Sequence, residues 1–399
     1  MAADQQLDPA TVQGVKQLKG IFRALERLAP SGCQRDQAGN RELLFPQYAG
    51  LVLLGLFNPT LQTVGGLSQL SELRKVQKLL GGPRVSVGSF SESARVFDPE
   101  ALHQIFEELF ESLPPATRTI SGGLIPAELL RKLTAVDGSA LRALPRLVAA
   151  AHSPRGKWRM HLEFEVLRSR PERVTVTADE VGGQADERSV LAQGLRKGRM
   201  YVMDRGYERY ALLEDIVQAG SDYLVRVQHR SLSVLQERPL SEVDREAGVL
   251  SDELVQPGRS RSEVGQVTHA VRRVTLADTG PGRRRTDRAV SEEMVLLTNL
   301  VDVPADVLAA IYRLRWSIEL FFRFLKHVLG CRHLLSHKSE GVAIQVYCAL
   351  IAALLMSQLT GQSVGKRGFE LVCLYLAGWA EEDELMAGIE RLARRKMKG

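Results

Sequence analysis

Four residues on one segment of the chain have the types and the spacing to hold a charged ligand. Residues 305–329 carry Tyr312, Arg315, Glu319 and Lys326. At 100° per residue, these side chains fall within roughly 60° of one another on a helix, and apolar residues fill the opposite arc. An ordinary amphipathic helix with a solvated Arg315–Glu319 pair has the same pattern. The segment therefore predicts one carboxylate among two cations and a phenol, without deciding what it does.

Two aspartates supply the other candidate carboxylates. Asp137 follows a short apolar run in VDGS, and Asp204 follows another in MDRGY. Each could simply begin a turn before a glycine, but a carboxylate at a strand end also lies where a sheet edge opens to solvent. With a third carboxylate from a packed helix, the two could bind a pair of Mg²⁺ ions about 4 Å apart, because hard ions prefer oxygen ligands. Such a pair suits phosphodiester transfer.

The surrounding elements predict an α/β core that positions these acids. Residues 157–167 alternate apolar and polar side chains as a half-buried strand does, and 187–195 and 210–219 have helical patterns. The resulting order, β-β-β-α-β-α-β, indicates a mixed five-stranded sheet with helices and is the order of the ribonuclease-H-like fold. The other predicted strands are residues 133–136, 173–177, 200–203, 222–227 and, later in the chain, 294–297.

Four further regions surround this core. Residues 1–125 predict a small helical N-terminal domain, which suits DNA binding or dimerisation equally. Residues 229–291 predict a β-rich insertion that divides the catalytic core into 126–228 and 292–340. Residues 341–399 predict a helical C-terminal region that could dimerise. Within the first region, helices are expected at residues 12–28, 48–56, 69–80 and 98–113, with a polar linker at 85–93.

Charge and composition narrow the possible partners. The net charge of +6 is compatible with a polyanion but decides little. Residues 256–290 hold eight arginines and no lysine, which favours either bidentate phosphate contacts or a solvated loop. The four dispersed cysteines indicate free thiols in a reducing cytosol. No apolar run reaches 18 residues, and 343–359 is expected to be a buried helix, so we expect a cytoplasmic protein without a membrane partner.

The chain resembles the insertion-sequence-four (IS4-type) family of DDE transposases. Tyr312-x2-Arg315-x3-Glu319-x6-Lys326 matches the family's YREK signature, and the segments VDGS and DRGY match its first two acidic motifs. The resemblance runs from about residue 86 to about residue 350. It implies that Asp137, Asp204 and Glu319 are catalytic and bind two Mg²⁺ ions, for which Mn²⁺ can substitute. It also implies that Tyr312, Arg315 and Lys326 hold the DNA backbone near the transposon end.

The resemblance further implies cut-and-paste transposition. The expected partners are double-stranded DNA, as terminal inverted repeats and as target, and a second copy of the chain in a synaptic homodimer; no nucleotide cofactor is expected. Such a protein would be bacterial, cytoplasmic and associated with the nucleoid. Some members form a DNA hairpin with an aromatic residue from the insertion, but residues 228–291 contain no Trp, Phe or Tyr. Trp316 is not assigned that role, since it lies about 100° around the helix from Arg315.

Two alternatives keep the same fold. One is a catalytically silent, domesticated DNA-binding protein, and the other is a nuclease that cuts DNA without joining strands. The three acids and the whole signature are intact, which favours the active transposase.

Overall fold

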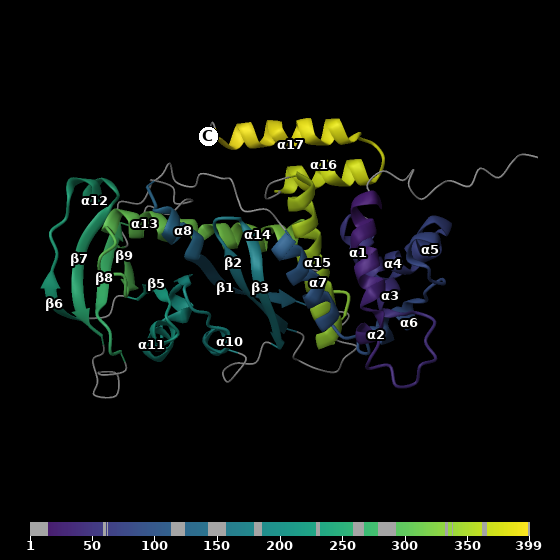
Figure 1. Ribbon diagram of the computed structural model, residues 1–399, viewed down its shortest axis with the longest axis horizontal. Coiled ribbons are helices and arrows are strands. Elements are labelled where there is room, and N and C mark those ends of the chain that lie inside the picture. Colours follow the sequence, from purple (N-terminus) through teal and green to yellow (C-terminus); the bar gives the residue numbers. More distant parts are fainter. Residues whose placement is uncertain are drawn as a thin grey trace, which may run out of the picture.

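A single large sheet forms the centre of the protein (Figure 1). The computed structural model describes residues 15–58, 61, 63–112, 124–142, 157–178, 186–228, 232–257, 267–277, 293–331, 334–336, 338–360 and 365–397. Nine strands lie in the order β3-β2-β1-β4-β5-β9-β8-β7-β6. The strands are β1 (Leu133–Arg142), β2 (Lys157–Glu165), β3 (Arg170–Ala178), β4 (Met200–Met203), β5 (Asp222–Val227), β6 (Ser233–Glu237), β7 (Val249–Gln256), β8 (Val271–Ala277) and β9 (Glu293–Thr298).

The sheet is mixed in direction. Strands β1, β4 and β5 are parallel neighbours, and every other pairing is antiparallel. The five strands and two helices predicted for the core are all present in the expected order. The strands of the predicted insertion, β6 to β8, continue the same sheet through β9 instead of forming a separate layer.

Helices cover both faces of the sheet. One face packs on α10 (Glu187–Gln193) and α11 (Tyr210–Gln218), through a core that includes Val136 and Met203. The opposite face packs on α13 (Ala305–Leu314) and α14 (Trp316–His327), through a core that includes Ala135 and Val202. Figure 1 shows the two helix pairs on opposite sides of the strands. Because successive side chains of a strand point to opposite faces, functional groups can reach the sheet edge from either layer.

Most of the remaining helices form a second mass beside the sheet, with α15 packed between this mass and the sheet (Figure 1). Helix α12 lies instead against β7 and α13, and α8 leads directly into β1. Helix α15 alone, among the described helices, is long and apolar enough to span a membrane, and 72% of its most apolar stretch is buried inside the protein. That burial indicates a core helix, as the sequence predicts. The remaining helices are α1 (Val15–Arg27), α2 (Ala29–Gly32), α3 (Phe45–Leu56), α4 (Val64–Ser71), α5 (Arg74–Leu80), α6 (Val87–Ser93), α7 (Glu100–Ser112), α8 (Ala127–Lys132), α12 (Glu242–Glu246), α15 (Ser339–Thr360), α16 (Lys366–Leu376) and α17 (Glu382–Met397).

Two predictions for the N-terminal helices were wrong. The helix expected at residues 69–80 is divided at Leu73, whose extended backbone caps α5. The expected polar linker at 85–93 contains helix α6, because the Ser86 side chain accepts a hydrogen bond from the Ser89 N–H and caps the helix. Phe90 then anchors that helix in the core.

The prediction that β2 is half-buried was also wrong. Glu163 and Glu165 are both buried on the strand face expected to be solvated. Their charges are balanced by arginines, since Arg196 bonds to Glu163 and Arg170 bonds to Glu165. Alternation in the sequence therefore identified the strand correctly but not its surroundings, because a paired carboxylate can be buried.

Candidate active site

The two aspartates lie side by side at the end of a parallel strand pair. Val136 of β1 is in register with Met203 of β4, and this pairing stops there, so Asp137 and Asp204 are the next residues on neighbouring strands. Neighbouring strands lie about 4.8 Å apart, which places the two carboxyl groups at one point of the sheet. We call Asp137 and Asp204 the acidic edge. The sequence predicted that Asp137 ends its strand, but β1 continues to Arg142 in pairing with β2.

Backbone N–H groups fix both side chains. Asp137 Oδ1 accepts a hydrogen bond from the Gly138 N–H at 2.8 Å. Asp204 caps the short helix η5 (Arg205–Tyr207), and its Oδ1 accepts from the Gly206 N–H at 2.8 Å. The glycines of VDGS and DRGY thus orient the acids that precede them.

Burial and mutual repulsion make the acidic edge a place that favours a cation. Burial and the charge of Asp204 together raise the pKa of Asp137 to about 7, although Arg315 and the Gly138 N–H oppose the shift. Two carboxylates so close cannot both ionise freely unless positive charge compensates them.

Glu319 reaches the acidic edge through Arg315. The Arg315 guanidinium donates to Glu319 Oε1 and lies 3.8 Å from Asp137 Oδ2, so one cation stands between the two acids. The helix predicted at 305–329 is divided at this residue, because Arg315 ends α13 and begins α14. The predicted apolar face is buried at Ile318, Phe322 and Leu325.

The predicted DNA-contacting residues differ in their exposure. Tyr312 is buried, with the Arg315 guanidinium 5.9 Å from the centre of its ring. Burial raises the pKa of Tyr312. The charges of Arg315 and Arg226 lower this pKa, and the charge of Asp204 raises it. Lys326 lies in the last turn of α14, two turns beyond Glu319, and is partly exposed.

The arrangement fits a divalent cation, although the acids do not yet enclose one. Among the described residues, no three His, Cys, Asp or Glu side chains stand together closely enough to hold a metal ion. The donors are carboxylate oxygens, as hard divalent ions prefer, and an arginine already bridges Asp137 and Glu319. These carboxylates already share one cationic partner, the Arg315 guanidinium. Asp137, Asp204 and Glu319 would be the residues that hold the ion.

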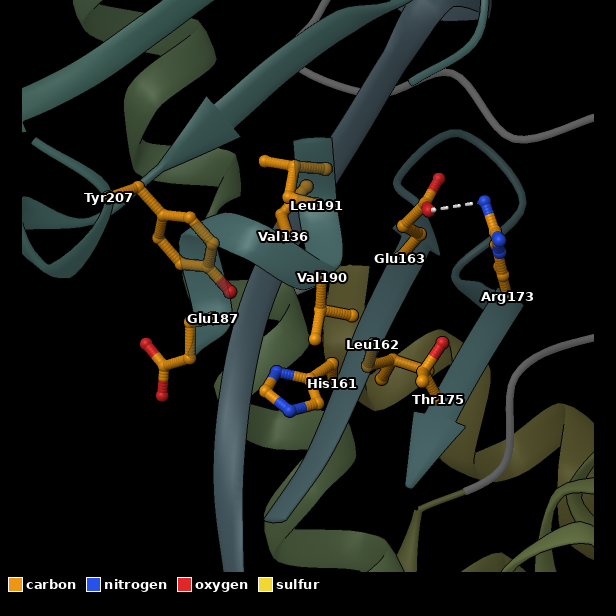
Figure 2. Close-up of a pocket in the computed structure, with 10 residues that line it drawn as sticks. All are labelled: Val136, His161, Leu162, Glu163, Arg173, Thr175, Glu187, Val190, Leu191 and Tyr207. Carbon is orange, nitrogen blue, oxygen red and sulfur yellow. Dashed lines mark ion pairs between the residues drawn. The ribbon is translucent and has the colours of Figure 1, made fainter. Parts of the chain in front are cut away.

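Sequence reasoning missed a fourth acid, Glu187, at the first turn of α10. A Cβ atom on Gly138 would overlap Glu187 Oε1, and a Cβ on Gly206 would lie 3.4 Å from Glu187 Oε2. The Glu187 carboxylate accepts a hydrogen bond from Arg159 of β2. Figure 2 shows Glu187 near Tyr207 in a small cavity that Val136 and His161 also line. The signal in the sequence was weak, because Glu187 marked only the start of a predicted helix.

The arginines of residues 256–290 do not all have the role that the sequence suggested. Arg272 is 1% exposed and donates to both carboxylate oxygens of Asp252 at 2.7 Å, and Arg273 pairs with Glu253. The burial of Arg272 makes that residue structural and contradicts a role for it as a phosphate contact or as part of a solvated loop. The other six arginines lie outside the described residues, namely residues 259, 261, 283, 284, 285 and 288.

An α/β sheet that presents paired carboxylates at one edge, beside a helix with a third, is the architecture of a metal-assisted phosphodiester enzyme. Comparison with known proteins gives the family directly. The model of the transposase DDE domain matches residues 129–355, and the chain belongs to this family. It is therefore a transposase, an enzyme of DNA transposition, and a DDE domain implies dependence on a divalent metal ion.

Relatives with transposase names cover most of the chain. The transposase for insertion sequence element IS421 of Escherichia coli is 24% identical over 340 residues, covering 76% of this chain and 90% of the relative. A transposase-named protein of Sinorhizobium fredii, y4zB, is 26% identical over 257 residues, covering 61% and 67% respectively. The piggyBac transposase synaptic complex with hairpin DNA aligns with a TM-score of 0.47 at 10% identity, over 98% of this chain and 82% of that one.

Proposed function

We propose that this transposase excises its element by Mg²⁺-dependent cleavage at the terminal inverted repeats and joins the freed ends to target DNA. The observation that carries the proposal is the acidic edge, with Glu319 joined to it through Arg315. The core strands β3-β2-β1-β4-β5 support a ribonuclease-H-like fold. On this proposal, Asp137, Asp204 and Glu319 are the catalytic carboxylates, and they bind two Mg²⁺ ions, with Mn²⁺ as a substitute.

The expected role of each residue of the site follows from its charge. When bound, the metal ions would supply Lewis-acid stabilisation, first of the phosphate at the transposon end, which water attacks to release a 3′-hydroxyl, and then of the target-DNA phosphate that this 3′-hydroxyl attacks. Arg315 holds Glu319 in place. Its guanidinium would also donate hydrogen bonds to a phosphate oxygen of the DNA, as arginine does in bidentate contacts. Lys326 would contact the DNA backbone further along α14, and buried Tyr312 would orient Arg315.

The same proposal covers partners and location. The enzyme would act on double-stranded DNA as a homodimer, with the N-terminal helices recognising the inverted repeats. It would work in the bacterial cytoplasm, in association with the nucleoid.

The test is cleavage of labelled DNA carrying the inverted repeats that flank the gene, in Mg²⁺ and in EDTA. We expect cuts at the repeat boundary only with the metal, and none from Asp204→Asn. We expect Glu319→Gln to lower the rate of DNA cleavage about 100-fold or more, with DNA binding retained. Unchanged cleavage by Glu319→Gln would remove that residue from the site. Specific binding without cleavage in any divalent metal would indicate the silent DNA-binding protein instead.

A further inference from the structure

Glu187 approaches the acidic edge from the face opposite to Glu319. Ala135 packs on the α13/α14 side of the sheet, so Asp137, two residues later on β1, points to that side, whereas Gly138 faces α10. The Glu187 carboxylate fills the space that a Gly138 side chain would need. The glycine of VDGS thus serves a second purpose beyond orienting Asp137, because it admits another acid to the site.

Gly206 admits the same carboxylate beside Asp204. Asp204 Oδ1 and Glu187 Oε2 lie 3.0 and 3.4 Å from the point where a Gly206 Cβ would stand. Both oxygens therefore border one small volume, next to the backbone of each acidic motif. Arg159 forms an ion pair with Glu187 in this arrangement, and its side chain is one-third exposed.

A buried hydroxyl without a partner points into the same region. Tyr207 is 0% exposed, and its Oη has no hydrogen-bond partner among the residues that the structure describes. The charges nearest to it are those of Glu187, Asp137 and Asp204, and Figure 2 shows its hydroxyl beside the Glu187 side chain. A buried hydroxyl ordinarily finds a partner, so this one indicates a further oxygen-bearing ligand, such as a metal-bound water, between Tyr207 and the acids.

We propose that Glu187 is a fourth acidic residue of the divalent-cation site, binding the ion together with Asp204 directly or through its water shell. The inference rests on the proposed function of the acidic edge and deepens it, since it adds a ligand that the transposase signature residues do not include. Arg159 would then hold Glu187 until the cation enters, and would compete with the cation for the carboxylate.

The test is Mn²⁺ binding to the whole purified chain, measured without DNA by the electron paramagnetic resonance signal of free Mn²⁺. We expect Glu187→Gln to weaken Mn²⁺ affinity at least tenfold, with the thermal midpoint and far-UV spectrum retained. Glu253→Gln is the matched control, because Glu253 is also paired with an arginine and has a side-chain exposure of 13% against 16% for Glu187. Its affinity should equal that of the unaltered chain.

Arg159→Gln separates a ligand from a merely structural residue. Freeing the carboxylate should tighten Mn²⁺ binding several-fold, and this gain should shrink in the Glu187→Gln background. A structural ion pair predicts the opposite, because both single variants would then weaken binding together with stability.

The outcomes distinguish this inference from the proposed function. Weaker binding in Asp204→Asn but unaltered binding in Glu187→Gln would overturn the inference and leave the proposed site intact. Weaker binding in both variants would support the inference. Weaker binding in Glu187→Gln alone would remove Asp204 from the proposed site and would overturn the inference as well, because the inference has the two residues bind the ion together.

Discussion

At the scale of single residues, the two carboxylates of the acidic edge lower the stability of the folded protein. Asp137 is mostly buried beside Asp204, and among the described residues the Arg315 guanidinium and the Gly138 N–H compensate its charge. Desolvation and like charge both disfavour ionisation, so the protein would be more stable without this carboxylate. Such a cost is expected where a charge serves a ligand.

The stability of the Asp137→Asn variant should show this cost. The pKa of Asp137 is about 7 in the folded chain and ordinarily 3.8. Between pH 3.8 and pH 7, the folded state therefore keeps a proton on Asp137 that the unfolded state has released. Stability therefore falls as pH rises through this window, and the full cost remains above pH 7. We expect Asp137→Asn to be more stable by on the order of 2 kcal/mol at pH 8, with the difference vanishing near pH 4. Urea unfolding at the two pH values measures it, and a gain independent of pH would contradict the assignment.

Cation affinity should depend on pH for the same reason. Below pH 7 a divalent ion must displace the proton of Asp137, so we expect Mn²⁺ affinity to fall about tenfold for each pH unit below 7 and to level off above it. Titrations of Mn²⁺ from pH 5.5 to pH 8 check the slope. Asp137→Asn serves as the control, since its remaining affinity should lack this dependence.

The sequence predicted some residues of the site better than others. Asp137 and Asp204 were found because each stands where a short apolar run meets a glycine, which is a local pattern. Glu187 was not found, because only the pairing of β1 with β4 brings it against Gly138 and Gly206. The bridging position of Arg315 was likewise hidden, since spacing indicates which side chains share a helix face but not which partner each one takes.

At the scale of elements, β7 and β8 illustrate how a charged residue can be structural. Arg272 bonds to Asp252 across the β7–β8 pair and also donates to the carbonyls of Leu300 and Val301, just before α13. This one side chain therefore connects the outer strands to the segment that leads into α13. The arginine-rich stretch suggested DNA contacts. The burial of Arg272 was not predicted, because the strand pairing that buries this residue joins residues distant in sequence.

Substitution of Arg272 tests that structural role. We expect Arg272→Met to lose about 3 kcal/mol of unfolding free energy, because buried Asp252 loses its bidentate partner and keeps the longer contact with Arg238 at 3.4 Å. Adding Asp252→Asn should recover part of the lost unfolding free energy, because the buried carboxylate that has lost its arginine partner is then removed as well. Arg273→Met is the comparison, and it should cost about 1 kcal/mol or less, since its pair with Glu253 is more exposed. Equal losses in urea unfolding would contradict the special role of Arg272.

At the scale of the whole molecule, α15 joins the N-terminal helices to the catalytic core. The Cys348 thiol of α15 donates to the Ala49 carbonyl of α3 at 3.9 Å, and Tyr347 packs its ring 6.4 Å from that of Phe106 on α7. The Tyr347 hydroxyl donates to the Val174 carbonyl of β3 on the other side. A helix from the predicted C-terminal region therefore shares one core with the first and second regions, which the order of segments along the chain could not reveal.

Separate production of the two parts of the chain tests this shared core. Residues 1–112 and 124–399, expressed together as two chains, should purify as one complex, because α15 supplies the apolar surface on which α3 and α7 pack. Residues 1–112 alone should give little cooperative thermal unfolding, since α3 and α7 would lose the packing from α15, including the contact between the rings of Phe106 and Tyr347. Circular dichroism against temperature, on the fragment and on the complex, makes the comparison. A cooperative transition in the fragment equal to that in the complex would instead establish an independent N-terminal domain, which could then recognise DNA ends apart from the catalytic core.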